Sequence, residues 1–431
     1  MRLINIHTLQ IQNFVGDPPP YAILSHRWIG EETTYEDFIN ESRRHGPGFE
    51  KVRRFCEFVR DFDEDELNDP PSWVWVDTCC IDKRSSAELS EAINSMAQWY
   101  RRSQLCVAYL NDVTATADLA SSEWFCRGWT LQELLFPKQI FLCGKDWNIL
   151  RTSEGTDLLP KFDDIIVEIT RIPKNCLQFD ILIYEESIAA RMSWMANRKT
   201  TRAEDIAYCL LGLFGVNLPL LYGEGINAFA RLQQEIIRQW ADESIFAWTG
   251  GMSREQGQRL IHGILASHPK EFTHCNEVVS RPMELRIPYK ITNRGFEITT
   301  KAVKVERAEI KSAWVYFIQL NCCWISRGHS EDTVIERACL LAIEPYESGY
   351  IRSHPWLTSE ELWSRFVLNS DPPQEVSEVD LQTYYIRLST NFSYAPPSST
   401  DIVGPRPGSV TLDRLFSDWQ RRIGSSNHRR G

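Results

Sequence analysis

Short apolar runs alternate with helical patterns between residues 21 and 144, and this alternation constrains the fold more than any other feature of the sequence. A helix between two strands returns the chain to the start of the next strand, so the pattern is typical of a parallel sheet with flanking helices. The sequence therefore predicts an α/β domain. Its expected strands are YAIL (21–24), WVWV (73–76), LCVAYL (105–110) and QIFLCG (139–144).

The rest of the chain changes its patterning twice. At 431 residues the chain exceeds the size at which one hydrophobic core usually stops growing, so we expect several domains. Helical patterns follow the α/β region, and runs of β-branched and aromatic residues separated by turn residues come after them. We predict an α/β domain (1–150), a helical extension (151–250), a β-rich C-terminal domain (251–395), and a linker and tail (396–431).

Charge and composition narrow the classes of partner. The net charge of -11 argues against nucleic acid, because binding phosphates requires a basic surface. The N-terminus has no apolar signal region, which predicts a cytoplasmic protein. Asn217 and Pro219 interrupt the long apolar run at 206–223, so we expect no membrane span. The twelve Cys residues form no CxxC pair, and we expect no metal and no bound cofactor.

Polar residues concentrate where the predicted strands end. Ligands of open parallel sheets bind beyond the carboxyl ends of the strands, because the strand-to-helix loops meet there. The simpler interpretation is that Asp, Asn and Ser at strand ends are ordinary turn and cap residues. Both interpretations are open for the residues at these ends, which include Ser25, His26, Arg27 and Trp28 after the first strand and Asp77 and Asp82 after the second.

One acid, Glu133, stands among apolar residues in WTLQELLFP, and three interpretations of it are open. Thr130 and Glu133 have the T-x-x-E spacing of a capping box, in which the Glu returns to the start of its own helix. A helix that begins near Ser121 would instead place both residues on a polar stripe and enclose Gly128, whose presence would suggest close approach by a backbone or a ligand. In the third interpretation, Glu133 faces the strand ends as a catalytic carboxylate.

Three blocks of the sequence resemble a known family. YAILSHRW, WVWVDTCCIDKRSSAELSEAINSMAQWY and FCRGWTLQELLFP are similar to the sequence blocks of the fungal heterokaryon incompatibility (HET) domain. The stretch from Ser187 to Trp248 resembles the segment that follows this domain in many such fungal proteins. The resemblance implies a role in fungal allorecognition and cell death, self-association through the HET domain, and an unidentified incompatibility or activating partner.

HET domains are in turn similar to Toll/interleukin-receptor (TIR) domains, which have a flavodoxin-like α/β fold. ILSHRWIGEE resembles the TIR block FLSFRGxD, and WTLQEL resembles W-C-x-x-E-L, whose Glu is catalytic in TIR enzymes that hydrolyse NAD at the nicotinamide glycosidic bond. This resemblance implies a catalytic Glu133. The sequence departs from the pattern at three positions, because Thr130 replaces the Cys, and His26 and Trp28 stand where TIR domains have an aromatic residue and usually Gly.

The residue types suit this chemistry. Cleavage of an N-glycosidic bond develops positive charge on the ribose, and a fixed carboxylate stabilises that charge. Nicotinamide leaves as a neutral ring, so a strong general acid is not required. The candidate substrate-binding residues are Trp28 or Trp129 for stacking on a base, Arg27 for the pyrophosphate, His26 or Asp77 for a ribose hydroxyl, and Ser25 and Asp82 beside them.

These expectations combine into one leading hypothesis and two alternatives. The leading hypothesis is a cell-death effector of fungal vegetative incompatibility that consumes NAD as a substrate through Glu133. The first alternative is a non-enzymatic signalling module in which Glu133 is structural. The second is a nucleotide sensor that binds NAD or a related nucleotide without cleaving it.

Overall fold

The chain forms two compact units, and each unit is built from separate stretches of sequence. The first unit comprises Met1–Glu185 and Asn197–Leu232, and the second comprises Glu186–Ala196 and Gln233–Gly431. The predicted domain boundaries therefore stay a prediction, and the predicted tail (396–431) lies outside the described residues. The computed structural model describes residues 1–62, 70–150, 164–178, 180–249, 263–281, 287–306, 314–327, 334–346, 349–352, 376–386 and 388.

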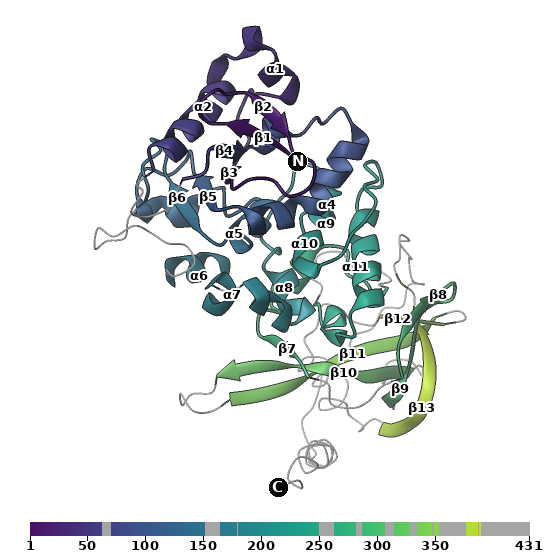
Figure 1. Ribbon diagram of the computed structural model, residues 1–431. Coiled ribbons are helices and arrows are strands. Elements are labelled where there is room, and N and C mark those ends of the chain that lie inside the picture. Colours follow the sequence, from purple (N-terminus) through teal and green to yellow (C-terminus); the bar gives the residue numbers. More distant parts are fainter. Residues whose placement is uncertain are drawn as a thin grey trace, which may run out of the picture. The chain divides into compact units, whose positions relative to one another are not determined.

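A six-stranded sheet with the order β2-β1-β4-β3-β5-β6 forms the core of the first unit (Figure 1). The four strands predicted from the apolar runs are confirmed, and they pair in parallel. Helices cover both faces of such a sheet, which explains why these strands are apolar without alternation. The bounds of the four strands are β3 (Ala22–His26), β4 (Trp73–Trp75), β5 (Leu105–Tyr109) and β6 (Ile140–Cys143).

An antiparallel hairpin extends this sheet at one edge and was not predicted. Its strands are β1 (Arg2–Asn5) and β2 (Ile11–Asn13), and β1 also pairs antiparallel with β4. Both strands are short, and β2 is mostly exposed, so neither produces an apolar run in the sequence. The alternation of strand and helix begins at β3, as the pattern from residue 21 onward predicts.

Two long amphipathic helices, α2 (Gly46–Arg60) and α4 (Ser86–Arg102), flank the sheet (Figure 1). One apolar face of each helix is buried, with Val52, Cys56 and Val59 in α2 and Ile93, Met96 and Tyr100 in α4. Ser85 caps α4 by accepting a hydrogen bond from the backbone N–H of Glu88, as the sequence spacing predicts. The shorter helices of this region are α1 (Tyr35–Ile39), α3 (Asp77–Cys80) and α5 (Thr130–Leu135), with 3-10 helices η1 (Glu41–Arg43) and η2 (Thr116–Ser121).

Helices predominate in the described part of residues 151–250, as expected. The stretch RAEDIAYCLLGLF forms two short helices because the chain turns at Cys209 and Leu210. No helix in the described ranges is long and apolar enough to cross a membrane. The elements are α6 (Asp164–Thr170), α7 (Lys174–Gln178), η3 (Asp180–Glu185), α8 (Ile188–Ser193), α9 (Asp205–Tyr208), α10 (Leu211–Phe214), α11 (Asn227–Gln239) and η4 (Glu243–Phe246).

The second unit contains a seven-stranded sheet with the order β7-β10-β11-β12-β13-β9-β8. A further pairing between β9 and β10 makes this sheet barrel-like and confirms the predicted β-rich C-terminal region. Its elements are η5 (Pro269–Phe272), β7 (Val278–Ser280), β8 (Lys290–Thr292), β9 (Gly295–Glu306), β10 (Trp314–Arg327), β11 (Val334–Tyr346), β12 (Gly349–Arg352) and β13 (Val376–Ile386).

Candidate functional site

The carboxylate of Glu133 meets the carboxyl end of the central strand β3. Ser25 is the second-to-last residue of that strand, and its Oγ lies 2.5 Å from Oε2 of Glu133. The indole Nε1 of Trp124 donates a hydrogen bond to the same Ser25 Oγ at 2.9 Å. All three side chains are buried. Glu133 therefore points toward the sheet edge at which the sequence places the candidate ligand-binding residues.

The capping-box interpretation of Glu133 is wrong. Helix α5 has Trp129 at its N-cap without a side-chain cap, and Thr130 is already the first helical residue. The Thr130 hydroxyl lies 2.5 Å from the carbonyl of Trp124 and 2.8 Å from that of Arg127. It is thus engaged with the preceding loop. The Glu133 carboxylate is engaged with Ser25, so neither side chain closes a capping box.

The longer helix starting near Ser121 is also wrong, because α5 has only six residues and is preceded by a turn. The expected close approach at Gly128 is present. The backbone N–H of Gly128 donates to the carbonyl of Lys199 at 2.8 Å, and the backbone N–H of Lys199 donates to the carbonyl of Cys126 at 2.7 Å. The backbone at Lys199 therefore approaches this glycine.

Burial controls the protonation of Glu133. It raises the pKa of Glu133 to about 7, while hydrogen bonds from Ser25 and Tyr100 and the charge of Arg127 act against that rise. The negative charge of Asp77 acts in the same direction as burial. A carboxyl group with a pKa near neutrality gains or loses its proton around physiological pH. Strongly shifted pKa values of this kind are common among the catalytic acids and bases of active sites.

Buried His26 and the less buried side chains of Asp77 and Glu32 form a second polar group beside Ser25. His26 Nε2 lies 3.7 Å from Oδ1 of Asp77 and 3.9 Å from Oε2 of Glu32. Burial, followed by the charge of Lys51, lowers the pKa of His26 to about 3, so the imidazole is neutral and these contacts are not ion pairs. Within the described part of the chain, both His26 ring nitrogens and these two oxygens are buried without a hydrogen-bond partner. Water or the polar groups of a ligand would satisfy them.

Trp28 covers the outer side of this group. Its ring is 42% exposed, and its Nε1 donates to Oδ2 of Asp77 at 2.9 Å. The ammonium of Lys83 lies 3.5 Å from the ring centroid, and the guanidinium carbon of Arg127 lies at 5.8 Å. Burial acts to raise the pKa of Asp77, but the charges of Lys83 and Arg127 hold it below its usual value. This part of the edge is therefore rich in positive charge.

The structure brings together Ser25, His26, Trp28, Asp77 and Glu133, but it engages the other three predicted residues elsewhere. Arg27 forms an ion pair with Glu123. Both carboxylate oxygens of Asp82 bind Arg84 at 2.9 Å. Trp129 shares a hydrogen bond with Asp205.

Segment 197–232 supports α5 from a distant part of the sequence. The guanidinium of Arg198 donates to the carbonyl of Arg127 at 2.9 Å and to the hydroxyl of Thr130 at 3.0 Å. Arg198 is buried, and burial lowers its pKa to about 10, so it remains charged. The start of the helix that carries Glu133 is therefore fixed by residues outside the predicted 1–150 domain.

Sequence reasoning missed four residues around this edge. The sequence assigns no polar role to Tyr100 or to Trp124, and both interact with the Ser25–Glu133 pair. Glu32 and Lys51 form a partly buried ion pair at 2.6 Å. Glu32 and Tyr100 lie within the sequence blocks that resemble known families, and this position is the signal that could have found them. Periodicity does not reveal which side chains converge from different elements.

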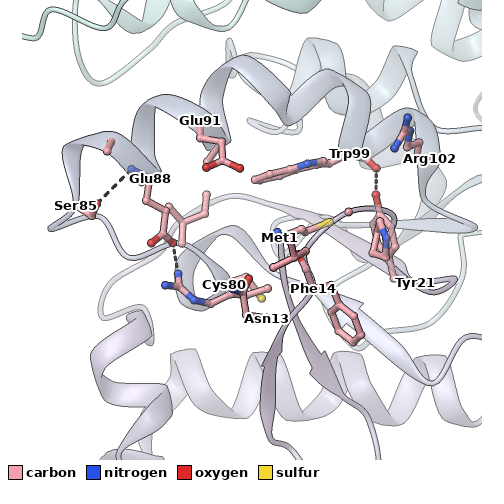
Figure 2. Close-up of a pocket in the computed structure, with 17 residues that line it drawn as sticks. Met1, Asn13, Phe14, Tyr21, Cys80, Ser85, Glu88, Glu91, Trp99 and Arg102 are labelled. Atoms are coloured by element: carbon pink, nitrogen blue, oxygen red, sulfur yellow. Dashed lines mark hydrogen bonds and ion pairs between the residues drawn. The ribbon is translucent and has the colours of Figure 1, made fainter.

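A pocket of about 600 Å³ lies elsewhere in the first unit, between the β1–β2 hairpin and α4 (Figure 2). Arg2 and Glu88 form an ion pair at its wall, and the Tyr21 hydroxyl donates to the carbonyl of Trp99 at 2.5 Å. Among the residues that the structure describes, those lining this pocket include none of the predicted site residues. This pocket and the polar residues around Glu133 thus lie in different places, and the convergence of candidate functional groups favours the edge that carries Glu133.

The fold and this edge define an α/β domain with a mostly parallel sheet and a buried carboxylate beyond its central strand. Residues 21–121 match the family model described as heterokaryon incompatibility protein (HET). This range includes Ser25, His26 and Asp77 and ends before Glu133. Residues 227–288 match a family described as a domain of unknown function, DUF8212.

A curated relative agrees with this match. Over 235 residues the chain is 40% identical to the vegetative incompatibility protein HET-E-1 of Podospora anserina. The aligned region covers 51% of this chain and 16% of the relative, so the chain spans only a small part of that protein. No solved structure is significantly similar to the chain. The two comparisons support a heterokaryon incompatibility domain at the N-terminal end of the chain.

Proposed function

We propose that the protein acts in fungal vegetative incompatibility and that its N-terminal domain hydrolyses NAD at the nicotinamide glycosidic bond. The family match and the similarity to HET-E-1 support the first part. The observation that carries the second part is the buried Glu133 carboxylate, which Ser25 directs toward the carboxyl end of β3.

The strand order supports a TIR or flavodoxin-like arrangement. Numbered along the chain, the parallel strands β3, β4, β5 and β6 lie in the order 2-1-3-4, which is the beginning of the flavodoxin-like order. In such sheets the ligand binds where the connections from adjacent strands leave in opposite directions. Here this point lies between β3 and β5, and Ser25 and His26 are at that end of β3.

The proposed chemistry requires only one carboxylate at the reacting carbon. As the bond from ribose C1 to the nicotinamide nitrogen breaks, its electron pair returns to the ring, and nicotinamide leaves as a neutral molecule. Ionised Glu133 stabilises the positive charge on the ribose. Water then adds to C1 and releases a proton, which gives ADP-ribose. Because the pKa of Glu133 is about 7, the active ionised form increases as pH rises through neutrality.

A non-enzymatic signalling module is the second candidate, and one observation favours it. Glu133 is only 7% exposed and is already hydrogen-bonded to Ser25 within the domain. A carboxylate in this setting can serve to hold α5 on β3. In this candidate the domain acts by pairing with itself or with an activating partner, and NAD is not consumed.

Nicotinamide release by the purified full chain distinguishes these candidates. The protein is incubated with NAD at pH 8, concentrated or with a crowding agent to favour assembly, and nicotinamide is measured by chromatography. Release above that of a heat-inactivated sample is expected. Binding of labelled NAD without release would favour a nucleotide sensor, and cell killing on overexpression without binding or release would favour the signalling module.

A further inference from the structure

Two hydrogen bonds in series end at the Glu133 carboxylate. Trp124 Nε1 donates to Ser25 Oγ at 2.9 Å, and Ser25 Oγ lies 2.5 Å from Glu133 Oε2. An indole N–H can only donate, so it uses a lone pair of the Ser25 oxygen and leaves the hydroxyl proton for the carboxylate. An ionised carboxylate can only accept, so the indole fixes the direction of the first bond and ionised Glu133 fixes that of the second.

The series is shielded from water. Ser25 is 0% exposed and Trp124 is 1% exposed. The three residues come from different elements, since Ser25 is in β3, Trp124 is in the loop before α5, and Glu133 is in α5. Hydrogen bonds to an ionised group are stronger in such a low-dielectric setting than in water. Loss of one bond would thus have a measurable effect on the carboxylate.

We propose, on the basis of the function proposed above, that Ser25 is a positioning residue for Glu133. Its hydroxyl, oriented by Trp124, fixes the direction of the carboxylate at the sheet edge and stabilises its negative charge. Trp124 acts on Glu133 through its hydrogen bond to Ser25. The pair would therefore set both the geometry and the pH range in which Glu133 acts.

Other charged and titratable groups also face Glu133, and they stay in place when Ser25 is changed. The charge of Arg127 and the hydroxyl of Tyr100 favour the ionised carboxylate, whereas Asp77 opposes it. From segment 197–232, Arg198 and Cys209 also interact electrostatically with Glu133. Because these groups are common to all the variants below, a difference between variants reports on the two hydrogen bonds.

Ser25→Ala is expected to shift the rising limb of the pH profile for nicotinamide release upward by about one pH unit, because a hydrogen bond to an ionised group is lost. This shift corresponds to roughly a fivefold loss of rate at pH 7. Trp124→Phe is expected to shift the limb in the same direction by a smaller amount. Since Trp124 acts through Ser25, the double variant should match Ser25→Ala alone.

Trp75→Phe is the matched control for Trp124→Phe. Trp75 is fully buried in β4, and its Nε1 has no hydrogen-bond partner among the described residues. Both substitutions remove the same atoms from the core of the same unit, but only one removes a hydrogen bond. Trp75→Phe is expected to leave the midpoint of the pH profile unchanged. An equal shift in both Trp variants would overturn the role of Trp124.

A second readout does not depend on catalysis. The Glu133 side-chain carbon is titrated by NMR with ¹³C-labelled Glu, and the resonance is assigned by its loss in Glu133→Gln. The titration midpoint is expected to rise in Ser25→Ala and, if that variant does not fold, to rise less in the nearly isosteric Ser25→Cys. An unchanged midpoint would overturn the proposal. A shifted midpoint in a protein that never releases nicotinamide would refute the proposed function and leave the positioning role intact.

Discussion

Glu133→Gln is expected to lower nicotinamide release on the order of 10³-fold and, at the same time, to make the domain more stable above pH 7. Gln has the shape of Glu but carries no charge, so it cannot stabilise the positive charge that develops on the ribose. Nicotinamide release at saturating NAD measures the first effect. Residual activity within tenfold of wild type would exclude Glu133 as the catalytic group.

The stability effect follows from the pKa of Glu133. Burial raises this pKa from 4.5 to about 7, so between these values the folded protein binds a proton that the unfolded chain has released. Stability therefore falls as pH rises from about 4.5 to 7, by roughly 3 kcal/mol at 1.36 kcal/mol for each pKa unit. Gln removes this loss. Urea unfolding should show little difference from wild type at pH 4 and a gain of up to about 3 kcal/mol at pH 8.

Glu204→Gln is a matched control with the opposite sign. Glu204 is another buried carboxylate of the same unit, and its Oε1 accepts hydrogen bonds from the backbone N–H groups of Gly223 and Gly225 at 2.7 and 3.0 Å. These backbone bonds hold the pKa of Glu204 below its usual value. Its replacement should therefore lower stability at pH 8, with a smaller effect in acid. A gain in both variants would point to a general effect of removing negative charge.

Gly212→Ala is expected to destabilise the first unit by roughly 3 kcal/mol, which is near the upper end of the usual cost of overpacking. A Cβ atom at Gly212 would lie 2.2 Å from the Cβ of Ala97 in α4 and 3.2 Å from the ring of Phe136. Ala97 lies in α4, and Phe136 directly follows α5, the helix that carries Glu133. A decrease of roughly 5–10 °C in melting temperature is expected in calorimetry.

The double variant Ala97→Gly/Gly212→Ala tests the reason for this loss. Removing the Cβ of Ala97 takes away the atom that the new methyl group would meet, although Gly within α4 costs about 1 kcal/mol of its own. Most of the stability lost in Gly212→Ala should therefore return. A double variant that is less stable than either single variant would show that α10 and α4 do not pack through these two positions.

The sequence predicted the strands of the parallel sheet because burial on both faces makes each of them a continuous apolar run. The hairpin strand β2 was missed because its residues are mostly exposed and form no such run. The helices α2 and α4 were predicted as well. Each is buried on one side only, and this burial places apolar residues at helical spacing in the sequence.

The sequence predicted at which edge of the sheet the candidate site lies, but it did not predict how the side chains there are arranged. Strand ends placed Ser25, His26, Trp28 and Asp77 together, because parallel strands present their carboxyl ends on one side. The direction of the Glu133 carboxylate was not predictable, since the helical pattern is the same whether it faces Thr130 or Ser25. A hydrogen bond between residues far apart in the chain, such as the one from Trp124 to Ser25, produces no periodic pattern in the sequence from which it could be predicted.

The contact of Arg198 and Lys199 with the start of α5 has a consequence for how this domain can be divided. The three motif blocks end by Pro137, yet the loop and helix that present Glu133 are completed by residues some sixty positions further along. A fragment that stops near residue 150 would keep the three motif blocks but lose the contacts of Arg198 and Lys199 that hold the start of the helix carrying Glu133. The smallest fragment that keeps these contacts therefore extends past the three motif blocks into segment 197–232, and the unit that contains them is discontinuous in sequence.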